Sequence, residues 1–121
     1  MIMHKICLLL LVALGVNAHA KPLDKDQNQQ QLNKFAISQC LMQSFPNSEL
    51  AADAGRASGA YVEFSEGEIE VYEKIAAAVA EQLQHPYQSK SGGSLHVMQC
   101  LEMPEQAELQ SIIGTVDPTR P

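Results

Sequence analysis

The stretch SEGEIEVYEKIAAAVAEQLQHP, residues 65–86, decides the fold of this chain. Its apolar residues recur three or four positions apart, and they therefore mark one face of an amphipathic helix. These residues are Ile69, Tyr72, Ile75, Ala76, Val79 and Leu83. Ser65 and Glu68 fit a capping box at the start of the helix. Pro86 ends it, because proline disfavours helical backbone in the residue before it. Such a helix needs neighbouring elements to cover its apolar face.

The segments on either side are also predicted to be helical. Residues 26–45 carry an apolar stripe after a Gln-rich start, and residues 49–62 form an alanine-rich helix that Asn47 or Ser48 caps. Two shorter helices follow. No stretch shows the sustained alternation of a strand. The fold class is therefore all-α, a compact bundle of four to five helices.

The shorter helices are expected at residues 95–103 and 104–113. Ser94 is placed to cap the first of them, and Pro104 suits the first turn of the second. The pattern leaves two inward faces open for residues 95–103. One face consists of Leu95, Met98 and Leu101, and the other of Val97 and Leu101.

The N-terminus, MIMHKICLLLLVALGVNAHA, has the layout of a secretory signal peptide. Lys5 is the basic residue, residues 6–16 are apolar, and Ala-His-Ala predicts cleavage after Ala20. The apolar run is too short to span a membrane, which takes about 20 residues. We expect residues 1–20 to be removed on export to a bacterial periplasm. Residues 21–121 then form a single helical domain with an ordered core at about residues 30–114.

The mature chain is strongly acidic. Loss of Lys5 leaves seven basic and fourteen acidic residues, a net charge of −7. This charge argues against binding to nucleic acid or to an anionic membrane, and it favours a basic protein partner. Acidic residues gather in one run, which either is a solvated helix edge or meets such a partner. They are Glu63, Glu66, Glu68, Glu70 and Glu73.

Two cysteines, Cys40 and Cys100, remain after cleavage. In an oxidising compartment such a pair most often forms one disulfide, which here joins the first helix to the fourth. A reduced cysteine beside His85 or His96 is the enzymatic alternative, a cysteine hydrolase. His96 and Cys100 share a helical face, but two ligands do not make a structural metal site. We therefore expect no catalytic residues, no metal and no cofactor.

The segment SKSGGSLHVMQC, residues 89–100, contains a glycine-rich loop. A phosphate-binding loop places its lysine directly after the last glycine and follows a buried strand. Lys90 precedes the glycines, and no strand precedes the loop. Residues 87–93 therefore form an exposed loop that ends at the cap of the next helix.

Several short motifs together resemble the type VI secretion amidase immunity proteins. In chain order they are Cys40-Leu41, DAGRASGAY at residues 53–61, YQSKSG at residues 87–92, Leu95, MQCL at residues 98–101 and Glu108-Leu109. The resemblance covers about residues 36–113. Gln99 departs from it, because a basic residue is expected before Cys100.

The resemblance implies a function. Proteins of this family are exported helical domains, often dimeric, that bind a secreted amidase tightly. The amidase is a papain-like cysteine enzyme that cuts peptidoglycan stems between D-glutamate and diaminopimelate. The immunity protein covers or plugs its catalytic cleft, and the producing cell is thereby protected. The alternative function is a periplasmic helical binding protein of the envelope-stress or chaperone-like kind.

The loop at residues 87–93 is the candidate partner-binding site. Its residues are Tyr87, Gln88, Ser89, Lys90, Ser91, Gly92 and Gly93. Glycines let the backbone enter a narrow groove, serine and lysine side chains offer donors, and Tyr87 can anchor the base. The alternative is that the loop is only the turn that delivers Leu95 and Cys100 to the core.

Overall fold

The structure of the protein is a computed structural model that describes residues 23–119. Within these residues it contains five α-helices, one short 3-10 helix and no strand, so the predicted all-α fold is confirmed. In chain order the elements are α1 (Lys25–Ser44), α2 (Glu49–Phe64), α3 (Ile69–Gln82), α4 (His96–Glu102), η1 (Met103–Glu105) and α5 (Ala107–Gly114). The expected signal peptide, residues 1–20, lies outside the described residues.

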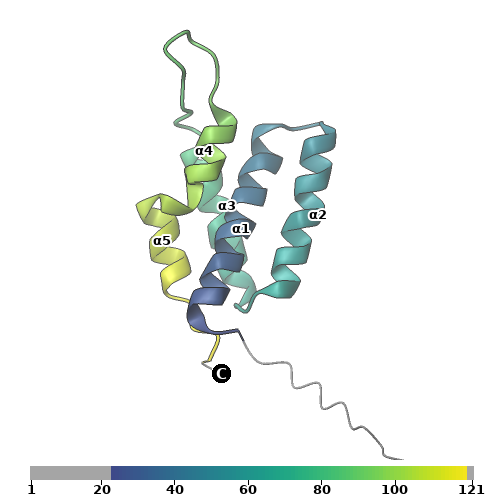
Figure 1. The fold of residues 1–121 in the computed structure, drawn as a ribbon, viewed down its shortest axis with the longest axis vertical. Helices are drawn as coiled ribbons and strands as arrows, with labels where there is room; N and C mark the ends of the chain where they lie inside the picture. The colour runs from purple at the N-terminus through teal and green to yellow at the C-terminus, as the bar shows by residue number, and fades with distance from the viewer. Residues whose placement is uncertain (1–22, 120–121) are drawn as a thin grey trace, which may run out of the picture.

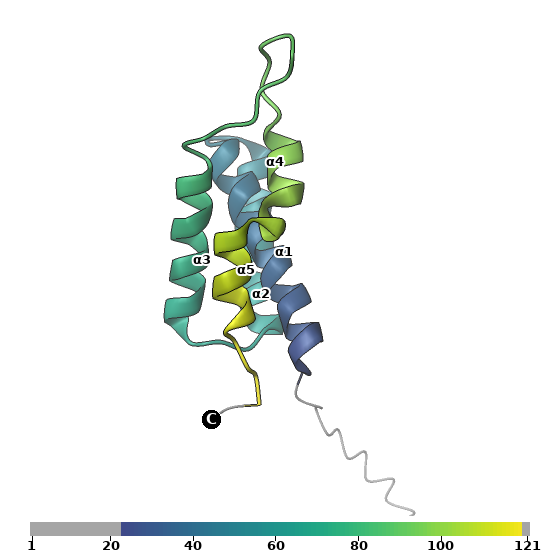
Figure 2. The same ribbon diagram turned by 90° about the vertical axis from the view of Figure 1, so that its left-hand side faces the viewer.

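The central element is α1, against which the other helices pack. α2 lies along one side of α1, and α4 and α5 lie on the other (Figure 1), while Figure 2 shows α3 alongside α5. A capping box starts α1. The Gln27 N–H donates to Asp24 Oδ1 at 2.7 Å, and the Asp24 N–H donates to Gln27 Oε1 at 3.3 Å. This cap makes the Gln-rich segment helical from Lys25 onward.

The apolar stripes of the longer helices meet in one core. Phe35 of α1 and Tyr72 of α3 are in edge-to-face contact, with ring centroids 5.3 Å apart. The buried core residues come from α1, α3, α4, η1, α5 and the segment after it. They are Leu32, Phe35, Ala36, Cys40, Ile75, Ala78, Val79, Cys100, Met103, Leu109, Ile113 and Val116. Ile69 does not join them. It is 67% exposed because it is the first residue of α3 and lies outside the packed face.

The capping box predicted at Ser65 and Glu68 is wrong. Glu68 precedes α3 without a side-chain cap, and Ser65 instead ends α2. The Ser65 hydroxyl donates to the Tyr61 carbonyl at 2.6 Å and lies 2.8 Å from the Tyr72 hydroxyl. Since these contacts engage the Ser65 side chain, it is not available to the first turn of α3. At the other end of α2, Ser48 is the cap, as its Oγ accepts the Ala51 N–H at 3.0 Å.

A buried amide holds the turn between α2 and α3. Asn28 belongs to α1 and is buried. Its side chain bonds to both the N–H and the carbonyl of one residue in the turn. The Glu66 N–H donates to Asn28 Oδ1 at 2.7 Å, and Asn28 Nδ2 donates to the Glu66 carbonyl at 2.8 Å. The turn is therefore fastened to α1 although the residues are far apart in sequence.

The start of α4 also differs from the prediction. The helix begins at His96, directly after Leu95 in the chain, and no side chain caps it. Ser94 forms an isolated antiparallel bridge with Gln88 and so belongs to the loop. The 3-10 turn η1 contains Pro104, and α5 begins after it at Ala107.

Neither inward face predicted for residues 95–103 is correct. Val97, Met98 and Leu101 are 52%, 48% and 62% exposed. The residues that point inward are Gln99, Cys100 and Met103. Residues three apart share one face of a helix, so Cys100 and Met103 point into the core together. Met98 and Leu101 share another face, which points outward. α4 is short and has apolar residues on all sides, and its periodicity therefore does not define a face.

The predicted disulfide is present. Cys40 of α1 and Cys100 of α4 are both fully buried, with an S–S distance of 2.13 Å and a Cα–Cα distance of 5.3 Å. The bridge fixes α4 against the central helix. Across residues 23–119, no helix combines the length and the hydropathy that crossing a membrane requires.

Candidate partner-binding site

The segment between α3 and α4 extends beyond the end of the bundle. Residues 87–93, which we call the projecting loop, begin at Tyr87 against the bundle and extend beyond the ends of the helices in both views (Figures 1 and 2). Gln88, Lys90, Ser91, Gly92 and Gly93 are exposed, while Tyr87 and Ser89 are half-buried. The loop is therefore the part of the described chain that is best placed to enter a cavity in another molecule.

Hydrogen bonds within the projecting loop give it a defined shape. The Ser89 N–H donates to the Gly93 carbonyl at 2.8 Å, and the Gly92 N–H donates to the Ser89 carbonyl at 3.0 Å. The Ser89 Oγ accepts the Gly93 N–H at 3.0 Å and lies 2.9 Å from Ser91 Oγ. Gly92 has a φ of 86°, a conformation that residues other than glycine rarely adopt. The loop is thus a small closed hairpin.

Tyr87 fixes the base of the loop to the bundle. Its N–H donates to Gln99 Oε1 at 3.2 Å, and its carbonyl accepts the Leu95 N–H at 3.2 Å. Its hydroxyl accepts from Gln106 Nε2 at 3.1 Å. The half-buried Tyr87 side chain therefore lies against the bundle. Gln99 and Gln106 had no signal in the sequence that linked them to the loop.

Among the described residues, Cys40, Cys100, His85 and His96 do not form a nucleophile site. Cys40 and Cys100 are joined, so neither carries the free thiol that the cysteine hydrolase alternative needs. His96 is in edge-to-face contact with Phe45, with ring centroids 5.8 Å apart, and His85 is exposed beyond the end of α3. In the part of the chain that the structure describes, no three side chains are grouped as metal ligands.

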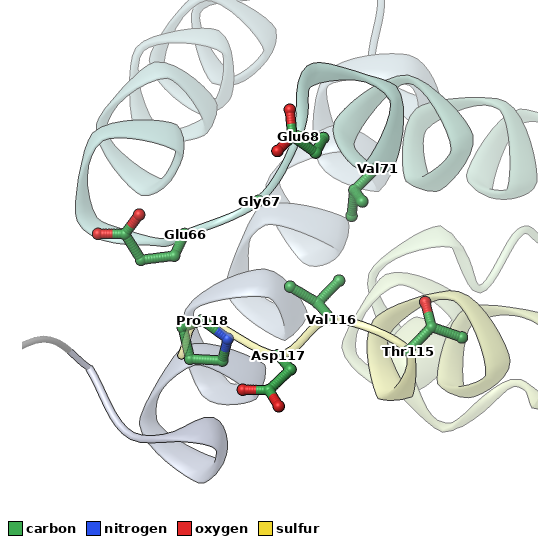
Figure 3. A pocket seen from close by; sticks show the side chains of 8 residues that line it. All are labelled: Glu66, Gly67, Glu68, Val71, Thr115, Val116, Asp117 and Pro118. Atoms are coloured by element: carbon green, nitrogen blue, oxygen red, sulfur yellow. The ribbon is translucent and has the colours of Figure 1, made fainter. Parts of the chain in front are cut away.

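The predicted acidic run lies around the end of the bundle that is opposite the projecting loop. Glu63, Glu66, Glu68, Glu70 and Glu73 are all exposed around the turn between α2 and α3. A shallow hollow of about 330 Å³ lies there, between that turn and the segment after α5 (Figure 3). Glu66, Glu68 and Asp117 border it. The acidic run is therefore exposed at the surface and lies apart from the projecting loop.

Comparison with known families identifies the class of this protein. The family model Tai4, described as type VI secretion system (T6SS) amidase immunity protein, matches residues 30–113. This range includes both bridged cysteines, the projecting loop and most of the helical bundle. The chain belongs to this family. A search of curated proteins finds no match to it.

Proposed function

We propose that this protein binds a T6SS-secreted peptidoglycan amidase and blocks its active site, and that it has no enzymatic activity of its own. The observation that carries the proposal is the projecting loop, a closed hairpin that stands beyond the bundle and is hydrogen-bonded at its base. Membership of the amidase immunity family supplies the partner class. Blocking protects the producing cell from the amidase.

The chemistry of the loop suits an enzyme groove that binds peptides. The amidase that we propose as partner is the papain-like cysteine enzyme that the resemblance implies, and its groove holds an extended peptide stem. Gly92 and Gly93 keep the tip narrow, and Lys90 and Ser91 present exposed polar groups. Because the hairpin is already closed, entering the groove orders few additional dihedral angles. The loop occupies the groove and excludes the substrate.

The exposed apolar face of α4 extends this contact surface. Val97, Met98 and Leu101 lie on the helix that comes next after the loop, and each is about half exposed. When the loop lies in the amidase groove, the rim of that groove would contact the first turn of α4. Covering these side chains removes apolar surface from water, which stabilises a complex.

We also propose that the protein is a periplasmic homodimer. Export rests on the expected signal peptide, residues 1–20, and dimerisation rests on the resemblance to a family in which dimers are common. Purification from the periplasm, followed by intact mass measurement, should give a chain that begins at Lys21. Light scattering should give twice that mass. A chain that retains residues 1–20 would contradict the proposed cleavage, and a monomer at micromolar concentration would contradict the dimer.

Growth on co-expression tests the proposed function directly. A candidate T6SS amidase is sent to the periplasm of a laboratory bacterium. Cells also produce the full-length protein, a version without residues 1–20, or neither. We expect only the full-length protein to prevent lysis. Lysis in all three strains, despite folded protein in the periplasm, would contradict the proposal and would favour the chaperone-like alternative.

A further inference from the structure

Gln99 is a polar residue whose side chain is buried in the bundle. It lies on α4 and is 2% exposed. A buried amide is stable only where its donors and its acceptor find partners. The partners of Gln99 all belong to the chain segment that carries the projecting loop.

The amide of Gln99 makes three hydrogen bonds, each to a backbone group. Its Nε2 donates to the Gln82 carbonyl at 3.0 Å and to the His85 carbonyl at 3.3 Å. Its Oε1 accepts the Tyr87 N–H at 3.2 Å. Gln82 is the last residue of α3, and its carbonyl also accepts the His85 N–H at 3.0 Å, while His85 lies just beyond the helix. One side chain thus fixes both the exit from α3 and the first residue of the loop.

The neighbour of Gln99 makes this point rigid. Cys100 is joined to Cys40, so α4 is covalently held against the central helix at that position. The disulfide therefore restrains Gln99 relative to α1, and the hydrogen bond from the Tyr87 N–H to Gln99 restrains Tyr87 in turn. The hydrogen bond from Gln106 Nε2 to the Tyr87 hydroxyl holds the same residue from the side of α5.

We propose that Gln99 is a positioning residue, which holds the projecting loop in the conformation that enters the amidase groove. This inference rests on the function proposed above. In this chain, the three hydrogen bonds need a side chain that has both a donor and an acceptor, which the basic residue expected in the family lacks. Lysine and arginine only donate, so neither can accept the Tyr87 N–H. Without Gln99 the loop samples more conformations, and ordering them on binding lowers the affinity.

Hydrogen exchange of the free protein tests the positioning without any amidase. The variant is Gln99→Met, which has a similar length and makes none of the three hydrogen bonds. Exchange at the Ser89, Gly92 and Leu95 amides should become about tenfold faster, because these amides close the loop and its base. Amides within α1 and α2 should not change. Gln110→Met, an exposed substitution on α5, is the matched control and should leave all amides unchanged.

Affinity for the amidase tests the consequence. Four proteins are compared: the natural chain, Gln99→Met, a chain with residues 89–93 replaced by a neutral linker of equal length, and the double variant. Gln99→Met should weaken binding about tenfold in the natural chain and should have no effect once the loop is replaced. An equal loss in both backgrounds would overturn the inference, and so would unchanged exchange in the loop.

The outcomes separate the two proposals. If the natural chain does not bind the amidase, the proposed function fails. The exchange experiment then still decides whether Gln99 holds the loop. If the natural chain binds and Gln99→Met binds equally well, the function stands and the role of Gln99 is refuted.

Discussion

The two ends of the bundle are fastened in the same way but differ in what lies beyond the fastening. At one end the buried amide of Asn28 holds both backbone groups of Glu66 in the turn between α2 and α3. At the other end the buried amide of Gln99 holds Gln82, His85 and Tyr87. The first turn passes directly into α3, whereas the second fastening point is followed by the projecting loop.

This difference shows how a small helical domain can present a fixed loop. An amide that pins a short turn contributes only to stability, because nothing extends past it. An amide at the base of a hairpin also sets the direction in which the hairpin points. We therefore expect changes at the Asn28 end to alter stability alone, and changes at the Gln99 end to alter binding as well.

The largest expected effect comes from removing the disulfide that holds α4 at the loop end. The double variant Cys40→Ala and Cys100→Ala should lose about 4 kcal/mol in its free energy of unfolding, because the bridge no longer restricts a long segment of the unfolded chain. Urea denaturation measures this loss. Hydrogen exchange should show more opening in α4 and the projecting loop than in α1 and α2. Equal opening at both ends would contradict the role given to the bridge.

Replacing the projecting loop should produce the next largest effect, and on binding alone. A neutral linker of equal length in place of residues 89–93 should weaken affinity for the amidase at least hundredfold, about 3 kcal/mol. Calorimetric titration measures the affinity. The midpoint of thermal unfolding should change little, since the replaced residues lie outside the core. Unchanged affinity would mean that the loop is only a turn that delivers α4 to the core.

Asn28→Ala should have the opposite effect to the loop replacement, because it should lower stability and leave binding unchanged. It leaves the Glu66 N–H and carbonyl without their partner, and the free energy of unfolding should fall by about 2 kcal/mol. Affinity for the amidase should remain within twofold of the natural value. Gln30→Ala, at an exposed position on the same helix, is the control and should change neither quantity appreciably. A large loss of affinity in Asn28→Ala would break the distinction between the two ends.

The smallest expected effect compares two glycines. Gly92→Ala should lower stability by about 1 kcal/mol, because alanine is strained at a φ of 86° even though the site has open space. Gly59→Ala on α2 should instead raise stability by up to about 1 kcal/mol, because alanine favours helix there and meets no neighbouring atom. Unfolding curves of the two variants give the comparison. A gain in stability for Gly92→Ala would show that Gly92 does not adopt its left-handed conformation in solution.

Much of the fold followed from the sequence because the longer helices carry long periodic patterns. The stripe that includes Tyr72 and Val79 located α3, and the two mature cysteines predicted their bridge. The helix ends at Gln82, a few residues before the proline that was expected to end it. The position of the loop followed from its turn-forming residues. Family membership, now shown for residues 30–113, came from the order of short motifs.

Other features were decided only by tertiary structure. The inward face of α4 was mispredicted because apolar residues surround a short helix, and the bond from Cys100 to α1 chooses the face. Ser65 was assigned to the wrong helix because its hydroxyl can serve either neighbour, and the positions of Tyr61 and Tyr72 decide which. Asn28 and Gln99 look like ordinary surface residues in the sequence. Their burial depends on backbone groups that are distant in the chain, and only the packed fold brings those groups within hydrogen-bonding distance.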